Sequence, residues 1–281
     1  MTFNEDCFFF YNKKGQYLYG CSYLPLISMS ETGIVIVPPV GHERLRCYRE
    51  CVNLARDLAD AGFAVMRFDY RGEGESFGEF EDFDVSSRLD DICVAADELK
   101  KRSGVKNICL LGFRLGALFS IMAAKNFNCT RLILCEPIFD TRKYVRNLIR
   151  AHIITVKEYF SDIKIKSEDV LERLEKGDAV SVYGFHVPAN YLQQLENINI
   201  GGSLDDFHGN IYFIGFCNKA KEKEIPNSLR QYYEMINFSG TCKWISVQTP
   251  FSWMTKKMWM DRISGLADKV IMAIEAWDEK P

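Results

Sequence analysis

The chain has 281 residues, 47% of them apolar and 26% charged, which are ordinary values for a globular protein. Its formal charge of −3 comes from interspersed acids and bases without a long basic stripe, which argues against a nucleic-acid-binding surface. No stretch approaches the ~18 uninterrupted apolar residues of a membrane-spanning helix, and the N-terminal segment does not resemble a signal peptide. We therefore expect a cytoplasmic protein that does not span a membrane.

Predicted strands and helices alternate over the first half of the chain. Two aromatic-rich strands at 6–11 and 17–24 are joined by a turn at Gly15, and 33–39 is a β-branched run typical of a strand buried on both faces. The pattern continues with a helix at 44–61, a strand at 63–70, a helix at 85–102, a strand at 105–112, a helix at 115–126 and a strand at 131–136. This alternation predicts a parallel sheet with right-handed crossovers.

The alternation stops between about 140 and 208, where the sequence is charged and its apolar spacing is helical. It resumes with a strand at 210–216, a helix near 226–236, a strand at 242–247 and a terminal helix from about 254. We therefore predict one α/β core formed by residues 1–139 and 209–281, with a helical cap inserted at 140–208.

The ten cysteines are scattered, and most lie inside hydrophobic runs. Because the chain has no secretory signal, this distribution predicts reduced core residues rather than a disulfide framework. Cys47 and Cys51 lie four residues apart, but no histidine lies at a ligand spacing from them. The sequence indicates neither a metal nor a cofactor.

The segment Gly112-Phe113-Arg114-Leu115-Gly116 follows a predicted strand and begins a predicted helix. Its spacing is that of G-x-S-x-G, the elbow that presents the nucleophile in α/β-hydrolases. Glycines at its two ends would let strand and helix approach closely, since a Cβ would clash there. The tip residue should be Ser, Cys or Asp, but it is Arg114.

Two further loops follow predicted strands, at the sheet edge where α/β proteins bind ligands. Gly41-His42-Glu43 comes after a double proline, in the position of an oxyanion-hole loop, although a plain strand-to-helix turn would account for it equally well. The loop 69–76 reads D-x-R-G-x-G-x-S and contains two of the three glycines of a dinucleotide motif, which makes nucleotide binding a weak interpretation. In α/β-hydrolases a loop of this pattern mainly supports the floor of the site.

The other two members of a catalytic triad are missing from their expected positions. The acid should follow the predicted strand at 210–216, but the next residue is Cys217 and no carboxylate comes before Glu222. The residues from Gln248 to Trp253, where the histidine is expected, contain none. The chain keeps the scaffold motifs but lacks all three triad residues at their expected positions. This combination disfavours conventional Ser-His-Asp chemistry.

These motifs resemble the α/β-hydrolase superfamily, of the serine aminopeptidase and acyl-esterase type, over nearly the whole core. The resemblance implies an α/β-hydrolase fold with a mostly parallel central sheet of about eight strands. Other segments are similar to the exosortase A system-associated hydrolases of the second type, namely PPVGHERLRCYRE, GFRLGA, LIRAHI, YGFHVPANYLQQLENINI and TPFSW. That closer resemblance implies a bacterial cytoplasmic protein whose hydrolase name reflects its fold.

Arg114 would lie at a helix N-terminus, where unpaired N–H groups favour an anion. Its guanidinium is either neutralised internally, by Glu43 first and Glu73 next, or binds a carboxylate or phosphate of a ligand, and the two roles are compatible. The candidate catalytic positions are Arg114, His42 and Glu43. The candidate ligand-binding residues are Gly41, Phe113, Leu115, Glu73, Phe251 and Trp253. Aromatic residues at 251, 253, 259 and 185 suggest a cleft for an acyl chain, although such residues more often belong to a core.

Three functions are compatible with the sequence. The first is a pseudoenzyme that binds an acyl, lipid-linked or peptide ligand with little or no conventional hydrolase activity. The second is an active esterase or thioesterase in which His42 activates a water and Glu43 or Glu73 orients it. The third is an interaction module whose cap, through the basic segment 141–150, docks a protein partner.

Overall fold

The computed structural model describes residues 2–160, 166–205, 207–217, 225–237, 241–249, 253 and 262–278. The strands are β1 (Phe3–Tyr11), β2 (Tyr17–Pro25), β3 (Thr32–Val37), β4 (Val65–Phe68), β5 (Asn107–Phe113), β6 (Arg131–Cys135), β7 (Val180–Val182), β8 (Phe185–Val187), β9 (Asn210–Cys217) and β10 (Thr241–Gln248). The α-helices are α1 (His42–Asp60), α2 (Val85–Ser103), α3 (Leu115–Ala124), α4 (Thr141–Tyr159), α5 (Ser167–Glu175), α6 (Ala189–Glu196), α7 (Ile200–Asp205), α8 (Asn227–Asn237) and α9 (Leu266–Asp278). Two short 3₁₀ helices are η1 (Phe80–Asp82) and η2 (Lys125–Phe127).

The central sheet has eight strands in the order β1-β2-β4-β3-β5-β6-β9-β10. Strand β2 is antiparallel to both of its neighbours, β1 and β4, and every pair from β4 across to β10 is parallel. The expected α/β-hydrolase fold with a mostly parallel sheet of about eight strands is therefore confirmed. The parallel strands all end at the same edge of the sheet, so the loops that follow β3, β5 and β6 meet there.

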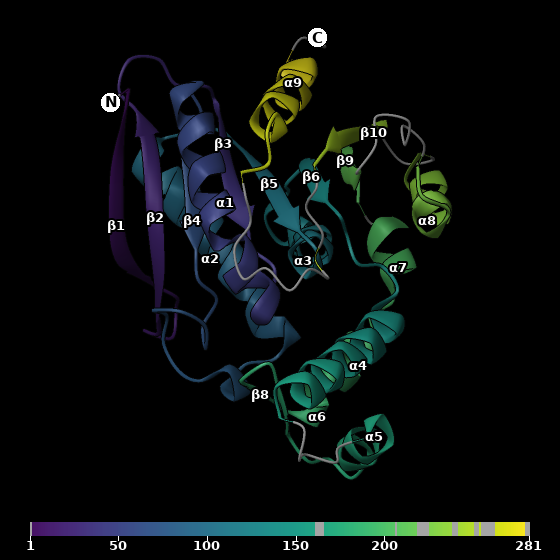
Figure 1. Ribbon diagram of the computed structural model, residues 1–281. Helices are drawn as coiled ribbons and strands as arrows, with labels where there is room; N and C mark the ends of the chain where they lie inside the picture. Colours follow the sequence, from purple (N-terminus) through teal and green to yellow (C-terminus); the bar gives the residue numbers. More distant parts are fainter. Residues whose placement is uncertain are drawn as a thin grey trace.

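Side chains of the central strands alternate between two hydrophobic layers, as the period of a strand requires. In β3, Ile34 and Ile36 pack against α1 and α9, whereas Val35 and Val37 face the layer that contains α2 and α3. Figure 1 shows the helices on both sides of the sheet, with the β1–β2 hairpin at one edge and β10 at the other. This arrangement buries β3 completely, in agreement with its β-branched run.

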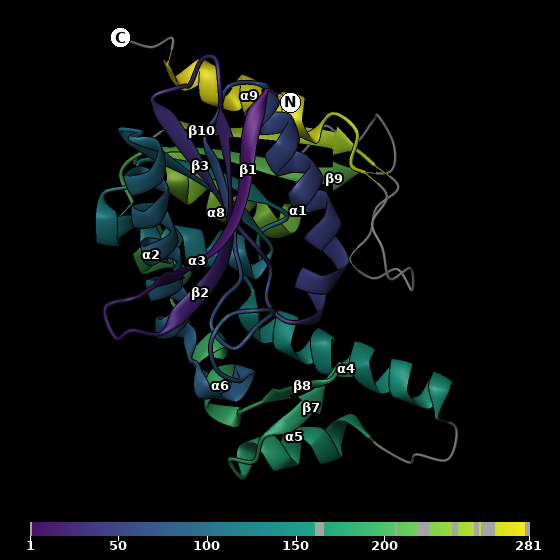
Figure 2. The same ribbon diagram turned by 90° about the vertical axis from the view of Figure 1, so that its left-hand side faces the viewer.

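Helices α4, α5 and α6, from the segment between β6 and β9, lie together beyond the carboxyl edge of the sheet (Figure 2). It was expected to be helical throughout, but it also contains the antiparallel hairpin β7–β8. The hairpin turns at Tyr183 and Gly184, which both have positive φ angles of 51° and 87°. The division into a core of 1–139 and 209–281 and a cap of 140–208 stays a prediction.

Most of the predicted elements are present with boundaries shifted by a few residues. The terminal helix is the exception, because α9 begins at Leu266 and not near 254. The described residues directly before it, 262–265, are not helical, and Gly265 has a φ of 77°. In the part of the chain that the structure describes, no helix combines the length and apolar character that crossing a membrane requires.

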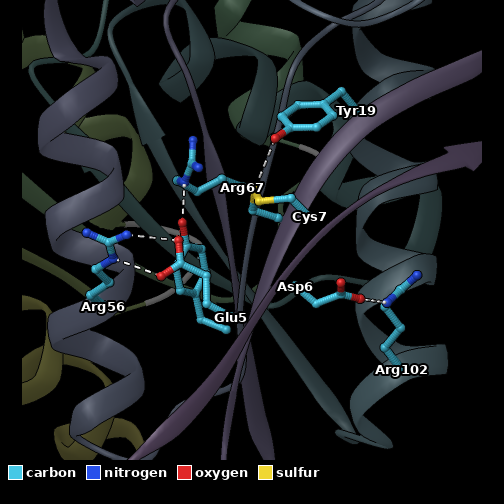
Figure 3. Close-up of a disulfide and its surroundings, with 9 residues drawn as sticks. Glu5, Asp6, Cys7, Tyr19, Arg56, Arg67 and Arg102 are labelled. Carbon is cyan, nitrogen blue, oxygen red and sulfur yellow. Dashed lines mark hydrogen bonds and ion pairs between the residues drawn. A yellow bond between two sulfur atoms is a disulfide. The ribbon is translucent and has the colours of Figure 1, made fainter. Parts of the chain in front are cut away.

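One expectation about the cysteines is wrong. Cys7 of β1 and Cys21 of β2 lie opposite each other in the hairpin and form a disulfide with a Cα–Cα distance of 4.1 Å. Direct opposition in an antiparallel pair brings two Cβ atoms into bonding range, and sequence spacing alone could not show this register. Figure 3 shows the bridge between two surface ion pairs, in which Glu5 reaches Arg56 of α1 and Asp6 reaches Arg102 of α2. The other eight cysteines are free thiols.

Candidate functional site

Arg114 occupies the tip of a nucleophile-elbow turn between β5 and α3. Its backbone has φ 55° and ψ −118°, a left-handed conformation that is rare for a residue with a side chain, and it caps the N-terminus of α3. The glycines on either side are required by close packing: a Cβ on Gly112 would lie 2.5 Å from the Ala117 backbone, and one on Gly116 would lie 2.3 Å from Pro38 O. The elbow predicted from the glycine spacing is therefore present, with an arginine at its tip.

The Arg114 side chain is held by Glu43, the second residue of α1. Nε and Nη2 of Arg114 donate to Oε1 of Glu43 at 3.2 and 3.0 Å. The other carboxylate oxygen, Oε2, accepts from the hydroxyl of Tyr144 on α4 at 3.2 Å. The two charged side chains are only 16% and 4% exposed, so this ion pair is mostly shielded from solvent. Of the two partners expected for Arg114, the structure has the first.

Two aromatic rings lie beside the same guanidinium. The Arg114 Cζ atom is 5.1 Å from the centre of the Trp253 ring and 6.0 Å from that of Tyr144, both within the range of cation–π attraction. Burial, with the Glu43 charge as the next cause, raises the pKa of the Tyr144 phenol well above its usual value. The phenol therefore stays protonated and keeps donating to Glu43.

His42, at the first position of α1, is stacked against the cap hairpin. Its ring lies 4.2 Å from the Tyr183 ring at an interplanar angle of 18°, and the Tyr183 amide donates to Nδ1 of His152 at 3.2 Å. Burial, followed by the charges of Arg46 and Arg114, lowers the pKa of His42 to about 4. His42 is thus a neutral and weakly basic imidazole at physiological pH.

Glu73 belongs to a different cluster beneath the oxyanion-position loop. Its Oε2 accepts from the Gly41 amide at 3.0 Å, and its Oε1 lies 3.7 Å from Nη2 of the buried Arg88. The Gly41 N–H is therefore occupied by a carboxylate. Burial raises the pKa of Glu73, which is 3% exposed. The structure does not place Glu73 beside Arg114.

The loop 69–76 is fixed by further buried ion pairs. Asp69 lies 2.5 Å from Nη2 of Arg44 on α1, and Nε of Arg71 donates to Asp91 on α2 at 2.5 Å. These contacts join the loop to helices on both faces of the sheet. They agree with the supporting role that the resemblance to α/β-hydrolases implies for this loop.

A cavity of about 810 Å³ lies above Arg114, between the elbow and α4. Its volume is within the range of small-molecule sites. It is lined by His42, Glu43, Arg46, Arg114, Glu136, Pro137, Ile138, Phe139, Asp140, Lys143, Tyr144, Asn147, Leu148, Ala151, Ile154, Thr155, Glu158, Tyr159, Tyr183, Pro226, Leu229 and Trp253. One face of α4 therefore forms a wall of the cavity that is apolar over much of its length, and the elbow closes one end of the cavity.

Some of the candidate site residues predicted from the sequence line the cavity, and others do not. Arg114, His42, Glu43 and Trp253 line it. Phe113, Leu115 and Gly41 are buried and do not line it, and Phe185 packs on Phe80 of η1 instead. Phe251 and Trp259 lie outside the described residues.

Sequence reasoning missed Tyr144 and Tyr183 and gave Glu136 no role. Tyr144 is on the apolar stripe of α4 that continues through Leu148 and Ala151, and such a stripe looks the same whether it faces a core or a cavity. Tyr183 precedes a glycine in a turn, a signal that could have indicated the hairpin. Nothing in the sequence alone showed that its ring would reach His42.

The fold, the elbow and the cavity at the carboxyl edge of the sheet define a protein of the α/β-hydrolase class. The chain belongs to the serine aminopeptidase S33 family, whose model matches residues 31–183. Among curated proteins it is similar to human protein ABHD12B, with 36% identity over 91 residues. That stretch covers 32% of this chain and 24% of the length of the human protein.

Solved structures of esterases have the same fold. Est1E from Butyrivibrio proteoclasticus with bound ferulic acid is 17% identical and superposes with a TM-score of 0.64, covering 96% of this chain and 97% of the esterase. The Pyrococcus furiosus esterase Pf2001 is 13% identical with a TM-score of 0.64, covering 99% and 92%. At such low identity these likenesses show the fold alone.

Proposed function

We propose that this protein is an α/β-hydrolase-fold pseudoenzyme that binds an acyl, lipid-linked or peptide ligand in the cavity above Arg114, with little or no conventional hydrolase activity. The observation that carries the proposal is that Arg114, at the nucleophile position, is ion-paired with Glu43. It has the backbone of a nucleophile elbow, its side chain is an ion-paired guanidinium, and the hydrogen bonds that this side chain makes among the described residues both go to Glu43. A guanidinium stays protonated and cannot act as a nucleophile.

The positions of the histidines support the absence of a triad. Its four histidines are His42, His152, His186 and His208. His42 is stacked on Tyr183, His152 accepts from the Tyr183 amide, and His186 contacts Glu81. His208 precedes β9, whereas a triad histidine is expected after the last strand of the sheet.

Ligand binding is supported by the cavity itself. Its volume and its apolar α4 wall suit an acyl chain or another apolar segment, and Arg114 with Trp253 offers a charged and aromatic end. The esterase structures with the same fold include one that holds ferulic acid, which supports a ligand with an acyl group.

The alternative is an active esterase or thioesterase that uses His42 as base and Glu43 as orienting acid. The family and the esterase structures favour it. Two contacts disfavour it, because both Glu43 oxygens are engaged and the low pKa of His42 makes it a weak base. General-base catalysis alone supplies roughly 10²–10⁴-fold, which would suffice only for activated esters.

Steady-state hydrolysis of p-nitrophenyl acetate, p-nitrophenyl butyrate and an acyl-CoA tests the proposal. We expect rates close to the uncatalysed background. Turnover above ~1 s⁻¹, an ordinary enzyme rate, that survives Arg114→Ala would contradict it. Loss of a measurable rate in a folded His42→Ala variant would favour the alternative.

The closer relationship to the exosortase A system-associated hydrolases of the second type, and with it a bacterial cytoplasmic setting, stays a proposal. It is supported by the arginine elbow, which the structure shows in the elbow conformation. Docking of a protein partner through the cap also stays a prediction. Two residues of its basic segment have contacts within the chain: Arg142 donates to Glu196 O, and Lys143 lines the cavity.

A further inference from the structure

Glu136, the residue directly after β6, occupies the position beside the elbow tip. The register pairs Phe113 of β5 with Cys135 of β6, so Arg114 and Glu136 are the next residues of two neighbouring strands. The Arg114 amide donates to Cys135 O at 3.0 Å, and the Glu136 amide donates to Ile214 O at 2.9 Å. The two side chains therefore start from adjacent points at the carboxyl edge of the sheet.

Both residues have strained backbones. Arg114 and Glu136, with φ angles of 55° and 48°, are two of the four non-glycine residues with positive φ in the described part of the chain. Such conformations are unfavourable for residues with a side chain, and they concentrate at functional sites. Glycine would be free of strain at this turn.

Only one of the two Glu136 carboxylate oxygens has a hydrogen-bond partner among the described residues. Oε1 accepts from the Phe216 amide of β9 at 2.7 Å, which fixes the side chain. Oε2 has no hydrogen-bond partner among the described residues, and Glu136 lines the cavity. Burial raises the pKa of this carboxyl although the nearby Arg114 charge acts to lower it.

Arg114 has a matching available donor. Glu43 occupies Nε and Nη2, whereas Nη1 has no hydrogen-bond partner within the described residues. Both residues line the cavity, and among the described residues each has one polar side-chain atom without a hydrogen-bond partner: a donor on Arg114 and an acceptor on Glu136. A ligand group that satisfies both must carry an acceptor and a donor close together.

We propose that Arg114 and Glu136 together form a recognition site for a secondary amide, so that the cavity selects N-acyl amide ligands over esters. The amide carbonyl accepts from Arg114, the amide N–H donates to Glu136, and the acyl chain lies along the apolar wall of α4. An ester has the carbonyl but no N–H. A free carboxylate would face the charges of Glu43 and Glu136. This inference rests on the proposed ligand-binding function and narrows its ligand class.

Calorimetric titration with matched ligands tests this site. N-butyl octanamide is compared with butyl octanoate, with the tertiary amide N-butyl-N-methyl octanamide and with octanoate. We expect the secondary amide to bind roughly 10- to 100-fold more tightly than the ester and the tertiary amide, as loss of one hydrogen bond to a charged group implies. Octanoate should also bind more weakly than the secondary amide.

The Glu136→Gln variant provides the second half of the experiment. Its amide oxygen can still accept from Phe216, but a donor replaces the free carboxylate oxygen, so the preference for the secondary amide should fall to within about threefold of the ester. The control Glu168→Gln, on exposed α5, should keep the full preference. Equal binding of amide and ester by the unaltered protein would overturn the amide site and leave the proposed function standing. Binding of none of the four ligands would overturn both.

Discussion

Glu43 binds Arg114 with one carboxylate oxygen and Tyr144 with the other, at 3.0 and 3.2 Å. One buried carboxylate thus connects the elbow, the start of α1 and helix α4. The contact explains how a guanidinium can occupy the position of a nucleophile: Glu43 compensates its charge, and its Cζ atom lies over the Trp253 ring.

Replacing Glu43 by alanine should destabilise the fold strongly. The change leaves the shielded Arg114 charge and the Tyr144 hydroxyl without their partner, and breaking a buried pair in this way costs about 3–5 kcal/mol. Urea denaturation monitored by circular dichroism measures the effect. The matched control is Glu5→Ala, which removes an exposed pair with Arg56 and should cost about 1 kcal/mol or less. A loss below about 1 kcal/mol for Glu43→Ala would show that the pair is not buried in solution.

Arg114→Ser should not create an esterase. The serine would occupy a correct elbow, but the base and the acid of a triad would still be missing. Hydrolysis of p-nitrophenyl butyrate by the purified variant should stay within about tenfold of the unaltered protein. A rise of 10³-fold or more, without any added histidine, would mean that a functional base already faces the elbow.

Glu50 of α1 should make stability depend on pH. It is 3% exposed, its Oε2 has no hydrogen-bond partner among the described residues, and burial raises its pKa from 4.5 to about 7. Between these values the folded state binds more protons than the unfolded state, so the free energy of unfolding falls as pH rises from 4.5 to 7 and then levels off. The contribution is on the order of 3 kcal/mol.

Urea denaturation at pH 5 and pH 8 measures this contribution. The glutamine of Glu50→Gln cannot ionise. The free energy of unfolding of this variant, relative to that of the unaltered protein, should therefore be higher at pH 8 than at pH 5. The exposed Glu168→Gln serves as the control and should show no such difference. An equal effect of Glu50→Gln at both pH values would contradict the burial of an acid with a raised pKa.

The Cys7–Cys21 bridge should stabilise the edge hairpin. It closes a loop with a sequence separation of 14, for which the chain-entropy model gives about 3 kcal/mol. Dithiothreitol should therefore lower the melting temperature of the unaltered protein. A Cys7→Ala/Cys21→Ala variant should have a lower melting temperature than the unaltered protein, and dithiothreitol should not lower it further. Identical melting with and without the reductant, with thiol counting that shows full reduction, would contradict a stabilising bridge.

The sequence predicted the fold well because its signals are local. Buried parallel strands appear in the sequence as continuous β-branched runs, as in β3. The glycines at 112 and 116 indicate by their spacing alone that a strand and a helix approach closely. The Arg114–Glu43 pair could also be predicted, since both residues follow neighbouring parallel strands. Local propensity was misleading for the β7–β8 hairpin, whose strands have only three residues each.

The rest of the site depends on relationships that one sequence does not contain. The sequence ranked Glu43 first and Glu73 next as partners of Arg114, but it could not show that Arg88 from α2 lies beside Glu73. Glu136 gains its place beside Arg114 only through the register of β5 and β6. The disulfide likewise follows from the register of β1 and β2.

A crystal structure of the protein grown with N-butyl octanamide tests the central claim most directly. The account predicts ligand density in the cavity above the elbow, with the Arg114 guanidinium still hydrogen-bonded to Glu43 and no histidine nitrogen within hydrogen-bonding distance of residue 114. Density for the ligand elsewhere with an empty cavity, or Arg114 turned into solvent with a histidine and a carboxylate beside the elbow, would contradict it.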